Sequence, residues 1–120
     1  MTYSEKLKDP RWQKKRLEIM ERDEFYCHNC GNHEMTLHVH HIAYSDGEPW
    51  DIENELLITL CELCHENETI EIKNSAKELI STLKSKGFMA WHFSNLIEYI
   101  SDLSKDEILE YLGKCEYKSK

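Results

Sequence analysis

Two cysteine pairs constrain the fold of this 120-residue chain more than any other feature. Cys27 and Cys30 form one Cys-x-x-Cys pair, and Cys61 and Cys64 form the other. The two-residue gap allows both thiolates of a pair to reach one ion while the N–H groups of the turn face the sulfurs. Two such pairs complete a closed four-sulfur site, which typically binds a structural zinc ion in tetrahedral geometry.

Length and composition indicate one domain, or a small module with an appendage. Hydrophobic residues make up 40% of the chain and charged residues 32%. There is no apolar run of the roughly 18 residues that a membrane span needs, and the first six residues lack the apolar core of a signal peptide. We therefore expect a cytoplasmic location, where clustered cysteines bind metal more often than they form disulfides. The fifth cysteine, Cys115, is interpreted as a spare thiol.

The net charge of −8 is distributed unevenly along the sequence. Residues 1–22 contain seven basic and four acidic side chains, for a net charge of +3. Residues 23–70 contain eleven acidic side chains and no Lys or Arg, whereas residues 71–120 contain eight of each sign. A cation bound by residues 23–70 would offset part of the negative electrostatic potential of this segment. The basic stretch is either a solvated helix face or an arm that contacts DNA phosphates. For the second role we single out Lys14, Lys15 and Arg16.

The segment between the cysteine pairs predicts two strands and places a double histidine near the end of the first. Residues 36–44 are rich in β-branched and aromatic side chains, and residues 55–60 would form the returning strand. Strand alternation would put Val39 and His41 on one face and His40 on the other. Both histidines can therefore serve one site only if the strand ends or bulges at this point.

Helices are predicted on both sides of this segment. The dipeptide Asp9-Pro10 fits an N-cap followed by proline in the first turn, so a helix should run from there to about Arg22. Helical spacing and stop residues predict further helices over residues 62–86, 89–101 and 104–112. Their apolar faces indicate either packing on the first module or a surface for docking or dimerisation.

Residues 27–65 contain, in order, a cysteine pair, His40-His41, Asn54, the second pair and His65. This order resembles the HNH endonuclease family, in the branch whose ββα-metal motif is stapled by a four-cysteine zinc site. The resemblance extends over roughly residues 10–70. It implies a small α+β fold, namely a ββα-metal (HNH) core with the zinc staple, an N-terminal helix and a helical C-terminal extension.

The resemblance also implies a domain division and a role for each chemical residue. Residues 1–70 would be the nuclease module with its basic N-terminal helix, and residues 71–120 the helical extension. The implied metal ligands are His40 and His65. The implied general base is His41, which Asn54 would help to hold in position.

One position departs from the family pattern. Relatives can have another histidine one turn after the second metal ligand, where this chain has Thr69. The resemblance therefore implies two protein ligands, His40 and His65, and leaves the catalytic ion open among Mg²⁺, Mn²⁺, Ni²⁺ and Zn²⁺. The neighbouring His38 is interpreted as a residue that lines the site or the surface.

These residue types suit the hydrolysis of a phosphodiester bond. Histidine has an unperturbed pKa of about 6.5, so its neutral ring can accept a proton from water at physiological pH. A divalent ion with few protein ligands keeps open positions for phosphate oxygens. We therefore expect a metal-dependent DNA endonuclease that nicks as a monomer, with His41 as base. The resemblance implies products with 5′-phosphate and 3′-hydroxyl ends.

Two other classes of protein remain open on the sequence alone. A non-catalytic, zinc-stapled nucleic-acid-binding or adaptor module would use the cysteines without cleaving DNA, but the presence of His41 and His65 favours the nuclease. An electron-transfer protein would bind iron through the cysteines and would absorb visible light. The expected partner is DNA, through its phosphate backbone, with no membrane involved. The C-terminal helices would provide the surface for any homodimer or protein partner.

Overall fold

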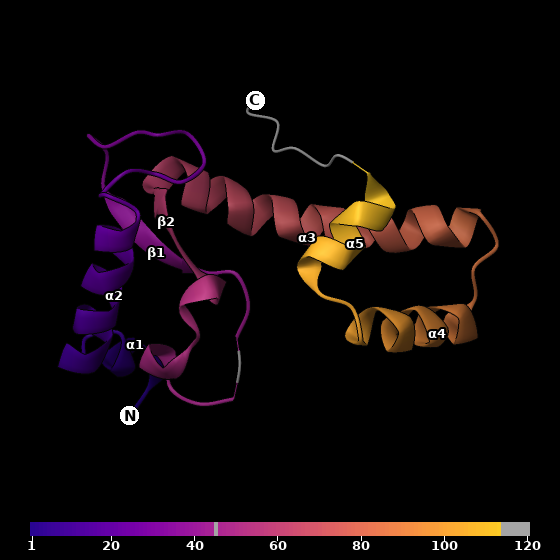
Figure 1. Ribbon diagram of the computed structural model, residues 1–120, viewed down its shortest axis with the longest axis horizontal. Helices are drawn as coiled ribbons and strands as arrows, with labels where there is room; N and C mark the ends of the chain where they lie inside the picture. Colours follow the sequence, from indigo (N-terminus) through magenta and orange to yellow (C-terminus); the bar gives the residue numbers. More distant parts are fainter. Residues whose placement is uncertain (45, 114–120) are drawn as a thin grey trace. The chain divides into compact units, whose positions relative to one another are not determined.

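The computed structural model describes residues 1–44 and 46–113. It divides into two compact units, Met1–Thr69 and Ile70–Lys120 (Figure 1). A two-stranded sheet with helices gives the chain the small α+β architecture predicted from the sequence. Among the described residues, no helix is both long and apolar enough to cross a membrane. The predicted spare thiol, Cys115, lies outside the described residues.

The first unit begins with two helices, α1 (Tyr3–Lys6) and α2 (Pro10–Arg22). The predicted start of α2 is confirmed, because the Asp9 carboxylate accepts a hydrogen bond of 2.8 Å from the N–H of Arg11. The short helix α1 was not predicted, since four residues are too few to show a periodic pattern. The buried residues of α2 are Trp12, Ile19 and Met20, which form its core face.

The sheet consists of β1 (Leu37–His41) and β2 (Leu57–Cys61), paired antiparallel with His41 opposite Leu57 (Figure 1). Both strands are shorter than predicted. The first ends at His41, and the second starts later than expected because Asn54–Leu56 form a short 3₁₀ helix before it. Another 3₁₀ helix, Pro49–Asp51, lies in the same connection. The end of β1 at His41 satisfies the condition for the two adjacent histidines to share one site.

Two apolar clusters hold the first unit together. In one cluster, buried residues of α2 and the sheet pack together, including Ile19, Val39 and Leu57. The other cluster surrounds the cysteine pairs and includes Leu60. The sheet thus links the helix α2 to the cysteine pairs, so the histidines of β1 lie on a packed scaffold.

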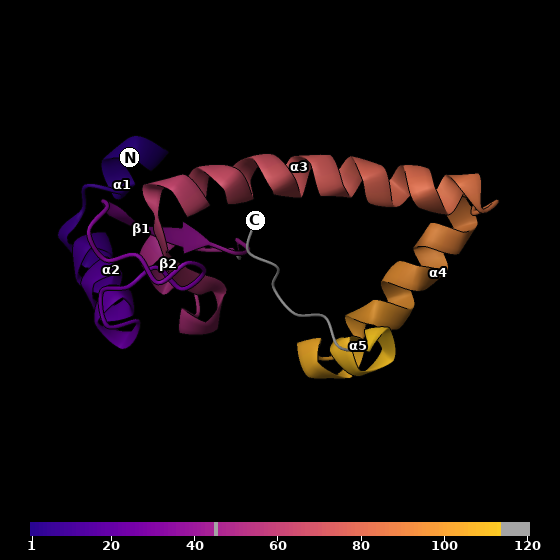
Figure 2. The ribbon, with the colours of Figure 1, turned by 90° about the horizontal axis from the view of Figure 1, so that it is seen from above.

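The helices of the second half confirm the predicted pattern: α3 (Glu62–Ser85), α4 (Ala90–Ser101) and α5 (Lys105–Leu112), with α4 and α5 following α3 in Figure 2. The Ser104 hydroxyl caps α5 by accepting the Glu107 N–H at 3.2 Å. Gly87 after α3 and Gly113 after α5 adopt φ of +89° and +76°, a region that favours glycine.

The apolar faces of the second unit are less covered than their spacing predicted. Leu79 of α3 and Ile97 of α4 are 60% and 66% exposed. Within the described part of this unit, no side chain is buried, and residues such as Leu83 and Leu96 are half-buried at most. The physical reason is size, because a unit of this length has too much surface for its volume to enclose a full core.

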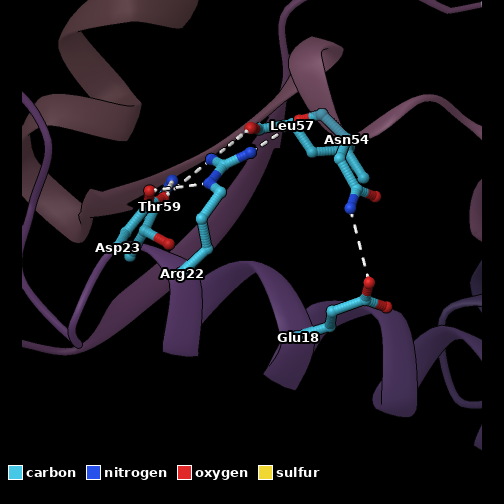
Figure 3. Close-up of polar contacts among 6 residues, drawn as sticks. All are labelled: Glu18, Arg22, Asp23, Asn54, Leu57 and Thr59. Atoms are coloured by element: carbon cyan, nitrogen blue, oxygen red, sulfur yellow. Dashed lines mark hydrogen bonds and ion pairs between the residues drawn. The ribbon is translucent and has the colours of Figure 1, made fainter.

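The C-terminal end of α2 is tied to the start of β2 by Arg22 (Figure 3). Its guanidinium donates to the carbonyl oxygens of Asn54 and Leu57, both at 2.7 Å, and to the Asp23 carboxylate at 2.9 and 3.0 Å. Asp23 also accepts the Thr59 N–H at 2.9 Å. Burial acts to raise the pKa of Asp23, but the hydrogen bonds from Arg22 and Thr59 outweigh it and lower the pKa below its usual value. Arg22 is therefore a structural residue.

Replacing Arg22 with alanine should lower the free energy of unfolding by about 1–2 kcal/mol, because two carbonyls and one carboxylate lose their charged donor at a partly exposed site. The matched control is Arg16→Ala on the same helix. Among the described residues, the guanidinium of Arg16 bonds Gln13 of its own helix at 3.4 Å. Urea unfolding followed by tryptophan fluorescence measures both variants. Equal losses in the two would show that the bonds from Arg22 across to β2 contribute nothing specific.

Candidate active site

The sulfurs of the four cysteines predicted to bind zinc all lie within 4.8 Å of one another. Cys30 Sγ and Cys61 Sγ are 3.7 Å apart. Four thiolates at about 2.3 Å from a tetrahedral ion would place neighbouring sulfurs roughly 3.8 Å apart, so the spacing fits such a site. A disulfide would need about 2.05 Å between sulfurs. The cluster can therefore hold a structural metal such as zinc.

Backbone hydrogen bonds of the first cysteine turn prepare this cluster for a cation. The Cys27 N–H donates to the Asn32 carbonyl at 2.9 Å, and the Gly31 N–H donates back to the Cys27 carbonyl at 2.8 Å. Burial acts to raise the pKa of Cys27, but backbone N–H groups, with that of Cys61 contributing most, lower it to about 6. Burial and the neighbouring sulfurs raise the pKa of Cys64. A bound cation would favour the thiolate form of all four cysteines, which is the form that binds metal.

A cavity of about 340 Å³ brings together three of the four predicted catalytic residues. Its lining includes His40, His41 and His65, and also His38 and Arg16. The cavity lies in the first unit, where the end of β1 lets both adjacent histidines line it.

His41 is held between two aromatic rings. The Trp12 ring lies 5.0 Å from it with an interplanar angle of 19°, and the Tyr44 ring lies 4.8 Å from it at 14°. His41 is only 8% exposed, although strands often present histidine to solvent. The two stacked rings restrict the plane of the imidazole.

The proton state of His41 follows from these surroundings. Burial lowers its pKa, the charge of the neighbouring His40 lowers it further, and a hydrogen bond to the Pro49 backbone opposes both; the pKa stays below its usual value. The Nε2 atom is buried and has no hydrogen-bond partner among the described residues. In the tautomer with the proton on Nδ1, the Nε2 lone pair is available as a proton acceptor.

His65 faces two histidines of β1. Its ring centre lies 5.3 Å from that of His40 and 5.2 Å from that of His38. It stands in the first turn of α3, directly after Cys64, so the cysteine cluster positions it. Burial lowers the pKa of His65, and the charges of His40 and His38 add to this effect. Neutral imidazoles are the form that binds metal, so this group of rings can hold a divalent ion.

Asn54 lies apart from the cavity lining. Its side-chain Nδ2 donates to Glu18 Oε1 at 3.4 Å, which is a long hydrogen bond. Its backbone carbonyl oxygen accepts a hydrogen bond from Arg22 (Figure 3). Its Oδ1 is buried without a partner, and the described residues show no hydrogen bond between Asn54 and His41. The role of Asn54 in holding His41 therefore stays a prediction.

The basic residues of the first 22 positions separate into two groups. Three of them form ion pairs, namely Lys6 with Glu48, Arg11 with Asp9, and Arg22 with Asp23. Among the described residues, no ion pair is found for the residues predicted to contact DNA. Of these, Lys14 is exposed, Lys15 and Arg16 are half-buried, and Arg16 alone lines the cavity.

Sequence reasoning missed the aromatic side of the cavity. The Tyr3 and Tyr44 hydroxyls lie 3.3 Å apart, which joins α1 to the segment after β1. Burial, with the hydrogen bond to Tyr44, raises the pKa of Tyr3 to about 12. Local pattern could identify Trp12 as a core residue but not as the ring stacked on His41. These contacts join residues about 30–40 positions apart in sequence, so no local pattern could have revealed them.

Comparison with known proteins agrees with the predicted family. Residues 27–71 match the family model described as HNH endonuclease. The matched segment contains both cysteine pairs, the double histidine and His65. No curated protein and no solved structure matches the chain.

Proposed function

We propose that this chain, whose residues 27–71 form an HNH endonuclease segment, is a metal-dependent DNA endonuclease. The family match supports a nuclease or nucleic-acid-related function in general. The observation that favours catalysis is the buried Nε2 of His41, which is unpartnered among the described residues, in a residue that lines the cavity with His40 and His65. In an adaptor module such an atom would only cost stability. In a nuclease it would be the free lone pair of a general base.

His41 would act as the general base. With a proton on Nδ1, its Nε2 would accept the proton of the water whose oxygen attacks phosphorus. The bond from phosphorus to the 3′ oxygen then breaks, and the leaving oxygen takes a proton from solvent. The products are a 5′-phosphate and a 3′-hydroxyl. Trp12 and Tyr44 would maintain the direction of attack by keeping the ring of His41 in one plane.

His40 and His65 would hold the catalytic divalent ion. When bound, such an ion supplies charge stabilisation to the phosphate and to the departing oxygen. Imidazole ligands suit Zn²⁺ and Ni²⁺, whereas Mg²⁺ prefers oxygen. Within the described residues, no carboxylate lines the cavity. The donor set therefore favours Zn²⁺ or Ni²⁺ over Mg²⁺, with Mn²⁺ intermediate.

The remaining parts of the chain would support this site. Residues 1–70 would act as the nuclease module, stapled by zinc on the four cysteines. Asn54 would contribute indirectly, since its carbonyl and side chain contact Arg22 and Glu18 of α2 and so anchor the connection that contains Pro49. Residues 71–120 would be an extension. Its use as a surface for a homodimer or protein partner stays a prediction, as does the cytoplasmic location.

The decisive test is cleavage of supercoiled, linear, single-stranded and branched DNA in the presence of Mg²⁺, Mn²⁺, Ni²⁺ or Zn²⁺. A monomeric nuclease with one site should convert supercoiled plasmid to nicked circles in a metal-dependent manner. A non-catalytic zinc module would bind the plasmid and leave it intact. An electron-transfer protein would show the visible absorbance of thiolate-bound iron in the purified sample.

Changing Lys14, Lys15 and Arg16 to glutamine should weaken binding to any duplex sequence, because side chains that bind phosphate do not distinguish bases. The log–log salt slope should flatten by about 0.9 for each phosphate that the protein no longer neutralises. The matched control changes Lys73, Lys77 and Lys84 of α3 to glutamine, which removes the same charge elsewhere. Fluorescence anisotropy at several salt concentrations measures both. An unchanged slope in the α2 variant would show that these side chains do not bind phosphate.

A further inference from the structure

We infer that His38 is a third protein ligand of the divalent ion in the site of His40 and His65. This inference rests on the proposed nuclease function and goes beyond it, because it assigns a role to a residue interpreted above as part of the site lining or the surface. Three lines of evidence support it: the position of His38 on β1, the spacing of the imidazole rings, and the lack of a suitable donor one turn further along α3.

His38 and His40 are two residues apart on β1, so their side chains leave the same face of the strand. Both face His65 at the start of α3. All three histidines line the same cavity. The strand and the helix thus present three imidazoles to one space, which is the arrangement that a three-nitrogen metal site requires.

The spacing of the rings agrees with shared coordination. A metal–nitrogen bond of about 2.1 Å, together with the roughly 1.1 Å from nitrogen to ring centre, places two ring centres about 5 Å apart at the tetrahedral angle. The observed separations are 5.2 Å for His38 and His65, and 5.3 Å for His40 and His65. His38 therefore lies as close to His65 as His40 does.

Binding requires a change in side-chain rotamer at this site. Among the described residues, only the four cysteines have ligand atoms that all lie within 4.8 Å of one another, so the three histidine nitrogens do not yet converge. His38 is exposed, and no hydrogen bond of its ring is found in the described part of the chain. Exposed side chains of this kind change rotamer readily.

No residue of the next turn of α3 offers a better donor. The hydroxyl of Thr69 is already engaged, since it donates to the His65 carbonyl at 3.0 Å. Glu68 is half-buried and lies three residues after His65, but it does not line the cavity. His38 is thus the one histidine of the cavity lining to which no other role has been assigned.

Calorimetric titration of Ni²⁺ and Mn²⁺ into the zinc-loaded full chain tests the inference without relying on activity. His38→Ala should weaken the affinity by at least the roughly 10-fold that loss of an outer-shell partner already costs. His40→Ala and His65→Ala should weaken it too. Thr69→His in the His38→Ala background should restore much of the affinity, because it places an imidazole one helical turn from His65. Glu68→Gln is the matched control and should bind like the wild type.

The outcomes separate this inference from the proposed function. If His38→Ala binds metal like the wild type while His40→Ala and His65→Ala lose it, the third-ligand role is wrong and the nuclease proposal stands. If Glu68→Gln loses affinity and His38→Ala does not, the ligand comes from α3 and the inference fails. If no variant changes the affinity and the wild type nicks no plasmid under any metal, both proposals fail.

Discussion

Replacing Cys61 with serine should abolish cooperative unfolding of the first unit. Cys61 is buried, its sulfur lies 3.7 Å from that of Cys30, and it belongs to the apolar cluster around the cysteine pairs. The first unit is too small for its apolar core alone to supply a large stability. Structural zinc in small modules contributes on the order of 10 kcal/mol, which is comparable to the whole net stability of a typical domain. Cys27→Ser should have the same effect.

The measurement combines zinc content by elemental analysis with urea unfolding followed by tryptophan fluorescence. Trp12 and Trp50 lie in the first unit, so their emission reports on its core. Cys115→Ser is the matched control, because it removes the one cysteine outside the two pairs and should leave both the zinc content and the unfolding curve unchanged. Native protein that is folded and contains no tightly bound zinc would contradict the prediction.

Replacing His41 with alanine should reduce nicking by about 10²–10⁴-fold, the usual cost of removing a general base. Metal affinity and DNA affinity should stay near the wild-type values, because the proposed metal ligands and the basic face of α2 are untouched. The cavity left between Trp12 and Tyr44 will lower stability somewhat. Unfolding curves must therefore accompany the rates, and nicking should be measured well below the melting temperature.

Replacing a proposed metal ligand should reduce nicking for a different reason. His40→Ala and His65→Ala should lose nicking through weaker binding of the divalent ion, and excess metal should restore part of the rate. His33→Ala is a suitable control, since His33 is exposed and makes an edge contact with Tyr26 at 4.9 Å rather than lining the cavity. Near-native nicking by His41→Ala would refute its role as base. Loss of metal by His41→Ala alone would reverse the assigned roles.

The charge of the first unit sets conditions on how DNA could approach the proposed site. Residues 23–70 contain eleven acidic side chains and no Lys or Arg, so this segment by itself repels phosphate. The positive charge that lines the cavity comes from Arg16 of α2. Bound metal ions would add further positive charge at the cysteine and histidine sites. We therefore expect DNA affinity to depend on α2 and on metal occupancy together.

Features determined by local chemistry were predictable from the sequence. The starts of α2 and α5 follow from the N-cap residues Asp9 and Ser104, whose side chains accept hydrogen bonds from backbone N–H groups in the first turn. The cysteine cluster follows from spacing, since a two-residue gap by itself lets a pair converge on one ion. The order of these residues around the double histidine indicated the family whose model residues 27–71 match.

The tertiary structure alone decided what surrounds the proposed catalytic ring and which charges are available. The stacking of Trp12 on His41 joins a helix and a strand that are far apart in sequence, and Tyr44 stacks on the same ring. Arg22 looked like part of a basic arm, yet it bonds the carbonyls that precede and begin β2. Sequence periodicity records which face of an element is apolar, but not which distant element packs there. That choice depends on the free energy of packing over the whole unit.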